Sequence, residues 1–209
     1  MRIRRTIPIP LLGVILLTGF LSAQPHSVNK PDDTSAIYAN LMRSPVFTAL
    51  GKRQDQCWAV VDTTINIDDM SPPLAPDAAL QPPSYDPKPF QEALADYNAR
   101  KYQRLTLTHS PQSGSSYLLL SPQEAADFRA SRGSANASDG AGKKYSGCAG
   151  ITYFSDAYFS SHRNAALVYM LNWCASLCSH GEWIYLEKRD DRWVQRSGQA
   201  AITSGAKPF

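Results

Sequence analysis

Residues 164–194, NAALVYMLNWCASLCSHGEWIYLEKRDDRWV, carry the strongest structural signal in this chain. Two runs rich in β-branched and aromatic residues, 164–173 and 182–188, flank the short connection CASLCSHG, which is typical of two paired strands. A third run starts at Arg192, directly after the turn RDD. Connections this short leave no room for helical crossovers, so we expect neighbouring strands to be antiparallel.

The segment GITYFSDAYF, residues 150–159, precedes this stretch and predicts one more strand, which completes a four-stranded C-terminal meander. Helices are expected upstream at 35–50, at 90–102 and from Ser121, where Glu124 can complete a capping box. Because the helices mostly precede these strands, the predicted fold class is α+β, with helices packed on one face of an antiparallel sheet.

The remaining chain predicts further strands and two irregular segments. A strand is expected at 57–67, which is rich in β-branched residues, and shorter strands at 104–108 and 117–120. The prolines of segment 70–89 favour extended chain over a helix or a central strand, so this segment is a linker or a surface wrap. Segment 131–144 has little to bury and is expected to be a mobile loop.

Residues 1–23 have the three-part layout of a secretory signal peptide. Three arginines make a basic start, a short apolar run follows, and Ala23 is a small residue suited to cleavage. We therefore expect an exported protein, periplasmic or extracellular, whose residues 24–209 form a single α+β domain. An uncleaved anchor is the alternative, but the apolar run is short for a membrane span and no later stretch is long enough.

The three leader arginines account for the whole formal charge of +3, so residues 24–209 carry no net charge. Nucleic-acid binding depends on basic surfaces that neutralise phosphates. The sequence therefore predicts no nucleic-acid partner.

The C-terminal stretch contains, in order, ALVY (166–169), CASLC (174–178) with Gly181, YLEK (185–188) and Trp193. This order resembles a family of uncharacterised secreted bacterial proteins, whose members carry ALVYV-like, CGxLCGxG-like and YVLLEK-like segments before a charged turn and a tryptophan. Ala175 and Ser179 stand where that family has glycines. The resemblance implies secretion and a shared β-rich core, and it implies no activity.

Four cysteines in an exported chain allow three pairings, and their even number favours disulfides. Cys174 and Cys178 lie in the predicted hairpin loop, where we expect a local bridge, which leaves Cys57 to pair with Cys148. The spacing of the local pair differs from the C-x-x-C of redox-active dithiols. A metal site at the histidines would need a second close pair of ligands, so neither a metal nor a cofactor is predicted.

The aromatic residues of the C-terminal strands, among them Trp173, Trp183 and Tyr185, are too numerous to face one core if strands alternate. Either both faces of the sheet are covered, one by helices and the other by the proline-rich segment, or an exposed aromatic patch binds a protein, peptide or carbohydrate.

His162 and His180, each next to a serine, leave an enzymatic function open, although no G-x-S-x-G or S-x-x-K motif is present. An enzyme would need a histidine within hydrogen-bond distance of a carboxylate or a nucleophile. We expect a non-enzymatic binding or interaction domain of the cell envelope, with the three aromatic residues and the two histidines as candidate contacts. The alternative is a small extracytoplasmic hydrolase with a site near His162 and His180.

Overall fold

The computed structural model describes residues 32–43, 57–107, 117–133, 148–175 and 178–196, all within the unit Pro31–Phe209. The side chains of Cys57, Cys174 and Cys178 lie outside this description. The helices are α1 (Asp33–Met42), the short 3-10 helix η1 (Ile67–Asp69), α3 (Pro76–Ala79), α4 (Lys88–Arg100) and α5 (Pro122–Gly133). The strands are β1 (Cys57–Val61), β2 (Tyr117–Leu120), β3 (Cys148–Phe154), β4 (Tyr158–Phe159), β5 (Ala165–Ala175), β6 (Cys178–Arg189) and β7 (Arg192–Arg196).

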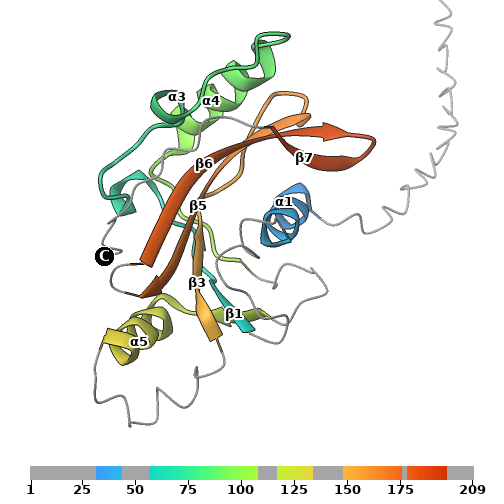
Figure 1. Cartoon of the computed structure of the whole chain (residues 1–209). Coiled ribbons are helices and arrows are strands. Elements are labelled where there is room, and N and C mark those ends of the chain that lie inside the picture. The colour runs from blue at the N-terminus through green and yellow to red at the C-terminus, as the bar shows by residue number, and fades with distance from the viewer. Residues whose placement is uncertain (1–31, 44–56, 108–116, 134–147, 176–177, 197–209) are drawn as a thin grey trace, which may run out of the picture. The chain divides into compact units, whose positions relative to one another are not determined.

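These strands form one mixed sheet in the order β2-β1-β3-β5-β6-β7, with β4 also paired to β5 (Figure 1). β1 is parallel to both of its neighbours, β2 and β3, whereas the pairs of β5 with β3, β4 and β6, and of β6 with β7, are antiparallel. The α+β class is confirmed, but the prediction of an antiparallel sheet is wrong for the first three strands. Helical connections carry the chain from β1 to β2 and from β2 to β3, and such crossovers return it in the same direction.

The run predicted as one strand at 150–159 is divided into β3 and β4, and their register with β5 shifts by one residue at the break. Ser155 lies at this break. Its N–H donates to Tyr169 O over 2.8 Å, and its Oγ accepts from Tyr169 N–H, also over 2.8 Å. An irregularity of this kind bends a strand and re-aims the residues after it. The C-terminal half therefore differs from the plain four-stranded meander that was predicted.

The hairpin of β5 and β6 is longer than the sequence indicated. Most of CASLCSHG, which was expected to be a loop, continues the strands: β5 extends to Ala175 and β6 begins at Cys178. These two residues are register partners, and residues 176–177 lie outside the described residues. The predicted bridge between Cys174 and Cys178 likewise lies outside them.

Helices cover both faces of the sheet, not one (Figure 1). Alternation along β6 places Trp183 and Tyr185 on the face that packs against α4 and α5, which we call the aromatic face. Ile184 and Leu186 point to the opposite face, which packs against α1 and which we call the α1 face. Two separate hydrophobic clusters therefore stabilise the sheet, one on each side.

The proline-rich segment 70–89 packs against the aromatic face, the same face as α4 and α5, so the prediction that it covers the face opposite the helices is wrong. Trp183 donates from Nε1 to the carbonyl oxygen of Leu74 over 2.7 Å, and Met70 and Leu80 are buried in the same cluster. The segment also contains the short helix α3, although its prolines predicted no helix. Pro76 is the first residue of α3, where a missing backbone N–H costs nothing because that group has no partner within the helix.

Arg100, the last residue of α4, anchors this helix to the break between β3 and β4. Its Nε donates to Asp96 Oδ1 over 2.7 Å, its Nη1 pairs with Asp156, and its Nη2 donates to the carbonyl oxygen of Ala157 over 3.0 Å. Asp156 is buried, and burial raises its pKa while Arg100 opposes the shift. An unpaired buried charge destabilises the fold. Arg100 therefore has to be retained as long as Asp96 and Asp156 are both present.

Several element ends differ from the predictions. α1 ends at Met42, before Pro45, and β1 ends at Val61 instead of continuing to Ile67. The strand predicted at 104–108 is reduced to a single bridge between Thr63 and Thr106. α5 extends to Gly133, into the predicted loop 131–144, and the rest of that loop lies outside the described residues.

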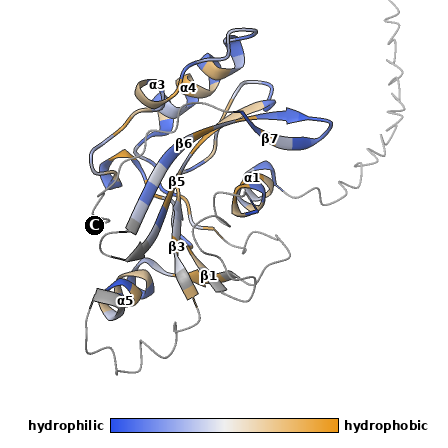
Figure 2. Ribbon diagram, viewed as in Figure 1, coloured by the Kyte–Doolittle hydropathy of each residue, from blue (hydrophilic) through white to orange (hydrophobic). Residues whose placement is uncertain are grey.

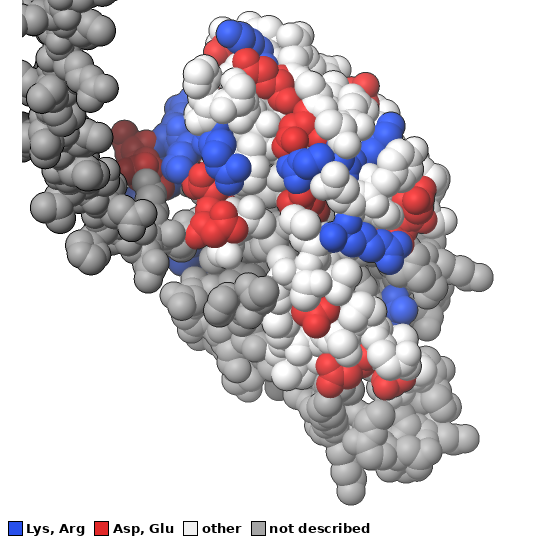
Figure 3. Space-filling view, turned by 180° about the vertical axis from the view of Figure 1, so that it is seen from behind, with Lys and Arg blue, Asp and Glu red and all other residues white. Residues whose placement is uncertain are grey.

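The surface is polar at the β7 edge of the sheet, where the strand is largely hydrophilic (Figure 2). Charged residues at an edge strand discourage pairing with another chain. On the face seen in Figure 3, the described basic and acidic side chains are interspersed, and they form no large area of one sign.

Candidate functional site

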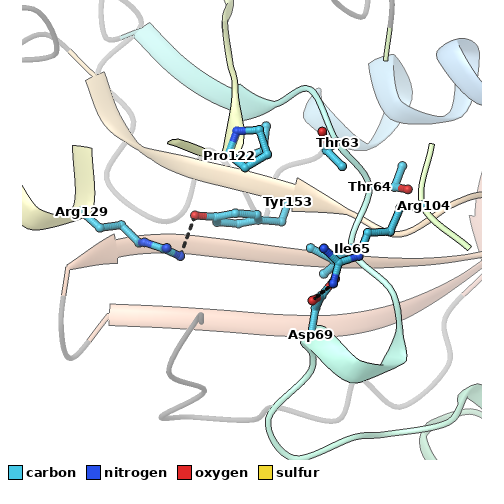
Figure 4. Close-up of a pocket in the computed structure, with 9 residues that line it drawn as sticks. Thr63, Thr64, Ile65, Asp69, Arg104, Pro122, Arg129 and Tyr153 are labelled. Atoms are coloured by element: carbon cyan, nitrogen blue, oxygen red, sulfur yellow. Dashed lines mark hydrogen bonds and ion pairs between the residues drawn. The ribbon is translucent and has the colours of Figure 1, made fainter. Parts of the chain in front are cut away.

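A pocket of about 380 Å³ lies on the aromatic face, beyond the carboxyl end of β1 (Figure 4). In open sheets with parallel strands, ligands bind outside the carboxyl ends of the strands, and this pocket has that position. Four separate parts of the chain supply its lining residues: Val61, Thr63, Thr64, Ile65, Asp69, Arg104, Pro122, Arg129 and Tyr153.

The first wall is the chain that follows β1, held in place by the segment that follows α4. Thr64 N–H donates to Leu105 O over 2.9 Å, and Leu105 N–H donates back to Thr64 Oγ1 over 2.8 Å. Thr63 forms a single antiparallel bridge with Thr106. These contacts fix the neighbouring Arg104 at the rim of the pocket.

The Asp69 carboxylate closes one end of the pocket. Asn66 caps η1: its side chain accepts from Asp68 N–H over 3.0 Å, and its own N–H donates to Asp69 Oδ2 over 2.9 Å. Arg104 pairs with the other carboxylate oxygen, Oδ1. Both oxygens of this nearly buried carboxylate are therefore engaged within the protein, while half of the Arg104 side chain stays exposed.

Tyr153 and Arg129 form the other end. Arg129 Nη1 donates to the Tyr153 hydroxyl over 2.9 Å, and its guanidinium carbon lies 5.8 Å from the centre of the Tyr153 ring. Burial raises the pKa of Tyr153, and Arg129 opposes the shift. Since the ordinary pKa is already near 10, this phenol stays protonated at neutral pH and its proton is a potential hydrogen-bond donor.

Two threonine hydroxyls also line the pocket. Thr63 Oγ1 donates to Asp62 Oδ1 over 2.9 Å, and Thr64 Oγ1 accepts the N–H of Leu105 over 2.8 Å. Figure 4 shows Arg129 and Arg104 on opposite sides of Tyr153, with Ile65 and Pro122 also lining the space. Hydrogen-bond donors at both ends and apolar groups between them are suited to binding.

The structure buries the three aromatic residues that the sequence analysis proposed as contacts. Trp183 is 1% exposed, Tyr185 3% and Trp173 5%, and all three belong to the cluster on the aromatic face. They form no exposed patch, because α4, α5 and the proline-rich segment pack against them. Of the two possibilities left open by the sequence, the covered face is the one found for these residues.

The two histidines lie far apart. His162 is exposed in the turn before β5, whereas His180 is half-buried on β6, opposite Asn172. Ala165 and Asn172 are seven positions apart on β5, which corresponds to about 24 Å at ~3.4 Å per step. The two histidines therefore do not share one site.

His180 belongs to a separate polar cluster on the α1 face. Its Nε2 lies 3.7 Å from Glu182 Oε1, an interaction that raises the pKa of His180 while partial burial opposes the shift. Thr152 donates to Asn172 Oδ1 over 2.8 Å, and Asn172 Nδ2 is buried without a hydrogen-bond partner. An orphaned buried donor destabilises the fold by about 1–3 kcal/mol.

The cysteines of the central strands lie at facing positions. Cys57 on β1 and Cys148 on β3 are register partners, and neighbouring strands are about 4.8 Å apart, within reach of a disulfide. Cys148 is buried and disulfide-bonded, but the cysteine that it joins is not among the described side chains. The pairing of Cys57 with Cys148 stays a prediction.

The pocket residues were missed from sequence because they come from distant segments. Arg104 follows a helix and Arg129 lies within one, where a charged side chain usually indicates a solvated surface. Tyr153 was one of many aromatic residues in a predicted strand. Among the described residues, no group of three or more His, Cys, Asp or Glu side chains could hold a metal ion.

No family model, curated protein or solved structure matches this chain. No helix in the described part of the chain is long and apolar enough to cross a membrane.

Proposed function

We propose that this chain is an exported, non-enzymatic domain that binds a small organic ligand in the pocket beside Tyr153. The observation that carries the proposal is the pocket itself, which joins two arginines, a buried phenol and apolar groups from remote segments. Ligand sites in proteins are commonly concave, apolar in most of their lining, and provided with a few convergent polar groups.

The state of the lining groups favours binding over hydrolysis. The two threonine hydroxyls are held by neighbouring groups, and the Asp69 carboxylate has both oxygens engaged. The hydrolase alternative would use His162 and His180, which lie at opposite ends of β5.

The leader supports the part of the proposal that concerns location. Its basic start, apolar run and small residue at Ala23 are typical of a cleaved signal peptide. We therefore place the ligand in the cell envelope or outside the cell. N-terminal sequencing of the exported protein should find Gln24 first, and a product that begins at Met1 would contradict this.

The binding function is tested on the exported protein, purified after expression of the full chain. A library of small metabolites is screened by thermal shift, and each positive compound is then titrated by calorimetry. A ligand present at one hundred times its Kd stabilises the fold by about 2.7 kcal/mol, which raises the Tm by roughly 5–10 °C for a chain of this size.

Two variants locate the binding site. Thr63→Trp places a large ring in the pocket and should abolish the shift. Gln195→Trp adds the same ring to the exposed edge strand β7 and should leave the shift unchanged. Turnover of ester or peptide substrates by the wild type, abolished by His180→Gln, would contradict a non-enzymatic role.

A further inference from the structure

The hydrogen-bonding groups of the pocket indicate which class of ligand it takes. We propose that the ligand is a compact ring compound with a carbonyl oxygen at each end and no hydrogen-bond donor of its own, such as a quinone. This inference rests on the proposed function and deepens it. Two buried hydroxyl groups and one guanidinium have hydrogens to offer, whereas the carboxylate among the described lining residues is already paired.

The Tyr153 hydroxyl is the first donor. Its oxygen accepts from Arg129 Nη1 over 2.9 Å, a contact that uses a lone pair and leaves the phenolic hydrogen available. Burial raises the pKa of Tyr153, so the phenol carries this hydrogen at neutral pH. No acceptor among the described residues takes it up, although Tyr153 is only 3% exposed. A buried donor without an acceptor destabilises a protein, and a ligand oxygen beside it would remove that cost.

Thr64 supplies a second buried hydroxyl, on the wall that follows β1. Its Oγ1 accepts from Leu105 N–H over 2.8 Å, which fixes the position of the side chain. Its own hydrogen meets no acceptor in the part of the chain that the structure describes, and Thr64 is 2% exposed. Thr63 differs, because its hydrogen is already donated to Asp62 Oδ1. Thr64 therefore adds a donor to the pocket.

Arg104 supplies donors at the other end of the pocket. It pairs with Asp69 through Nη2, and half of its side chain is exposed. A guanidinium has five N–H donors, and no further acceptor among the described residues pairs with Arg104. Both oxygens of Asp69 are engaged, one by Arg104 and the other by Asn66 N–H. This ion pair therefore offers N–H groups to a ligand, and Asp69 compensates the charge of the arginine.

A ligand that fits these groups accepts hydrogen bonds at both ends. A ligand hydroxyl could also accept from Tyr153, but its own hydrogen would need an acceptor, and Asp69 is already paired. An ammonium group would be disfavoured for the same reason. A carbonyl oxygen has two lone pairs and no hydrogen, so it satisfies the donors without adding a new unpaired group.

The space between the two ends suits a ring. Ile65 and Pro122 line it, and the Tyr153 side chain extends between Arg129 and Arg104 (Figure 4). The face of a tyrosine ring packs well against another flat ring. At about 380 Å³, the pocket lies near the lower end of the range for sites that hold drug-sized molecules. A substituted single or double ring is therefore of suitable size.

Calorimetric titration of the exported protein with matched ring compounds tests the inference. The carbonyl probes are duroquinone and menadione. Their reduced forms, durohydroquinone and menadiol, have the same carbon skeletons with O–H groups in place of the carbonyls, and diaminodurene has amino groups instead. All titrations are run without oxygen. We expect at least one quinone to bind about 10- to 100-fold more tightly than its matched donor compounds, because a buried unpaired donor costs an amount of this order.

Variants assign the two ends. Tyr153→Phe keeps the ring and removes the hydroxyl, so it should weaken the quinone about 10-fold and reduce its preference over the hydroquinone. Arg104→Lys keeps a cation beside Asp69 but loses the planar fork, and it should also weaken the quinone. Tyr85→Phe is the matched control and should change neither quantity, because Tyr85 is 64% exposed and pairs with Glu187, outside the lining of the pocket.

Infrared spectroscopy supplies a readout that a loss of stability alone would not move. A carbonyl that accepts a hydrogen bond absorbs at lower wavenumber than a free carbonyl. The quinone bound to the wild type should therefore show lowered carbonyl bands, and Tyr153→Phe should return one band toward the position of a free carbonyl. Tyr85→Phe should leave the bands unchanged.

The results separate this inference from the proposed function. If a library compound with hydroxyl or ammonium groups binds and is blocked by Thr63→Trp, while neither quinone binds, the binding function stands and the inference is overturned. An unchanged preference for the quinone in Tyr153→Phe also overturns it. If neither the library nor the quinones bind, both proposals fail. Should Arg104→Lys fold poorly, as judged by circular dichroism, the affinity and carbonyl bands of Tyr153→Phe decide.

Discussion

The sheet has a parallel half, β2-β1-β3, and an antiparallel half, β5-β6-β7, and the two halves are stabilised differently. In the antiparallel half, consecutive strands pair directly and aromatic rings pack densely on one face; Trp183 alone lies within 5.3–6.2 Å of the rings of Tyr97, Tyr158 and Tyr169. In the parallel half, strands remote in sequence pair, and the pocket opens where β1 ends.

The two halves of the sheet therefore have different roles. The antiparallel half provides the denser aromatic core, and the parallel half provides the pocket. The half with the denser aromatic core buries Trp173, Trp183 and Tyr185 beneath α4, α5 and the proline-rich segment. The half with helical crossovers leaves strand ends, loop backbone and charged side chains around a pocket of about 380 Å³. Substitutions in the antiparallel half should therefore affect stability, whereas those around the pocket should affect affinity. The predictions below test this division in order of expected effect.

The largest effect should come from the proposed bridge between Cys57 and Cys148, because it would close a long loop across the parallel half. In the chain-entropy model, a loop of about ninety residues gains roughly 4–5 kcal/mol from closure. Cys57→Ser with Cys148→Ser should lower the free energy of unfolding by about that amount. Hydrogen exchange should increase first in β1 and β2, while β5 and β6 stay protected.

The bridge itself is checked by peptide mapping without reduction. A tryptic fragment that joins Cys57 to Cys148 is expected. Alkylation of either thiol in the untreated protein would show that the parallel half is not linked in this way.

Trp183→Ala should have the largest effect in the antiparallel half. The ring is 1% exposed, and its removal leaves a cavity and deprives the Leu74 carbonyl of its donor. Loss of a buried tryptophan costs about 3–5 kcal/mol, to be measured by urea unfolding. Tyr153→Phe, the matched change beside the pocket, should cost less than about 1.5 kcal/mol. Equal losses in the two variants would contradict the division of roles.

Gly181→Ala probes how tightly the antiparallel half is packed. A methyl group at this position would overlap the hydroxyl of Tyr169, with its carbon 2.8 Å from Tyr169 Cζ and 3.3 Å from Leu171 Cδ1. Overpacking of this kind costs about 1–3 kcal/mol. Adding Tyr169→Phe removes one overlap and should restore part of the loss in a double-mutant cycle. If the losses of the two single variants simply add in the double variant, the strand shifts to relieve the overlap and the Tyr169 hydroxyl is not the cause of the loss.

His180→Gln should have the smallest effect, and its effect should depend on pH. Because Glu182 raises the pKa of folded His180 above 6.5, the protonated histidine contributes stability that is fully present below about pH 6.5. That contribution is lost as pH rises through the folded pKa. The variant should therefore cost up to about 1 kcal/mol at pH 5.5 and less at pH 9. An equal cost at both pH values, measured by thermal unfolding, would exclude this interaction as its cause.

The sequence predicted the antiparallel half better than the parallel half for a physical reason. The hairpin of β5 and β6 is local, so two strand-like runs and a short connection identify it. The pairing of β1 with β2 and β3 depends on crossovers that no local pattern records. The prediction at 57–67 was too long, because β1 leaves the sheet after Val61 and the chain then forms single bridges.

The candidate site could not be predicted for the same reason. Arg129 contacts Tyr153 from another element, and Arg104 meets Asp69 across 35 positions of the chain. The capping box at Ser121 and Glu124 was visible because its residues are three positions apart, and the structure confirms it with Ser121 N–H donating to Glu124 Oε2 over 3.0 Å. Contacts between residues three or four positions apart can be predicted from the sequence. Contacts between different helices and strands can be identified only once the fold is known.

Arg100 has a consequence for how this chain can diverge. One guanidinium compensates Asp96 on its own helix and the buried Asp156 at the break between β3 and β4. Loss of the arginine alone would leave two carboxylates close together, whereas loss of Asp156 alone leaves a paired arginine. Among relatives of this chain, positions 100 and 156 should therefore covary, with Asp156 replaced before Arg100 along any lineage. Sequences that lack Arg100 should then also lack Asp156.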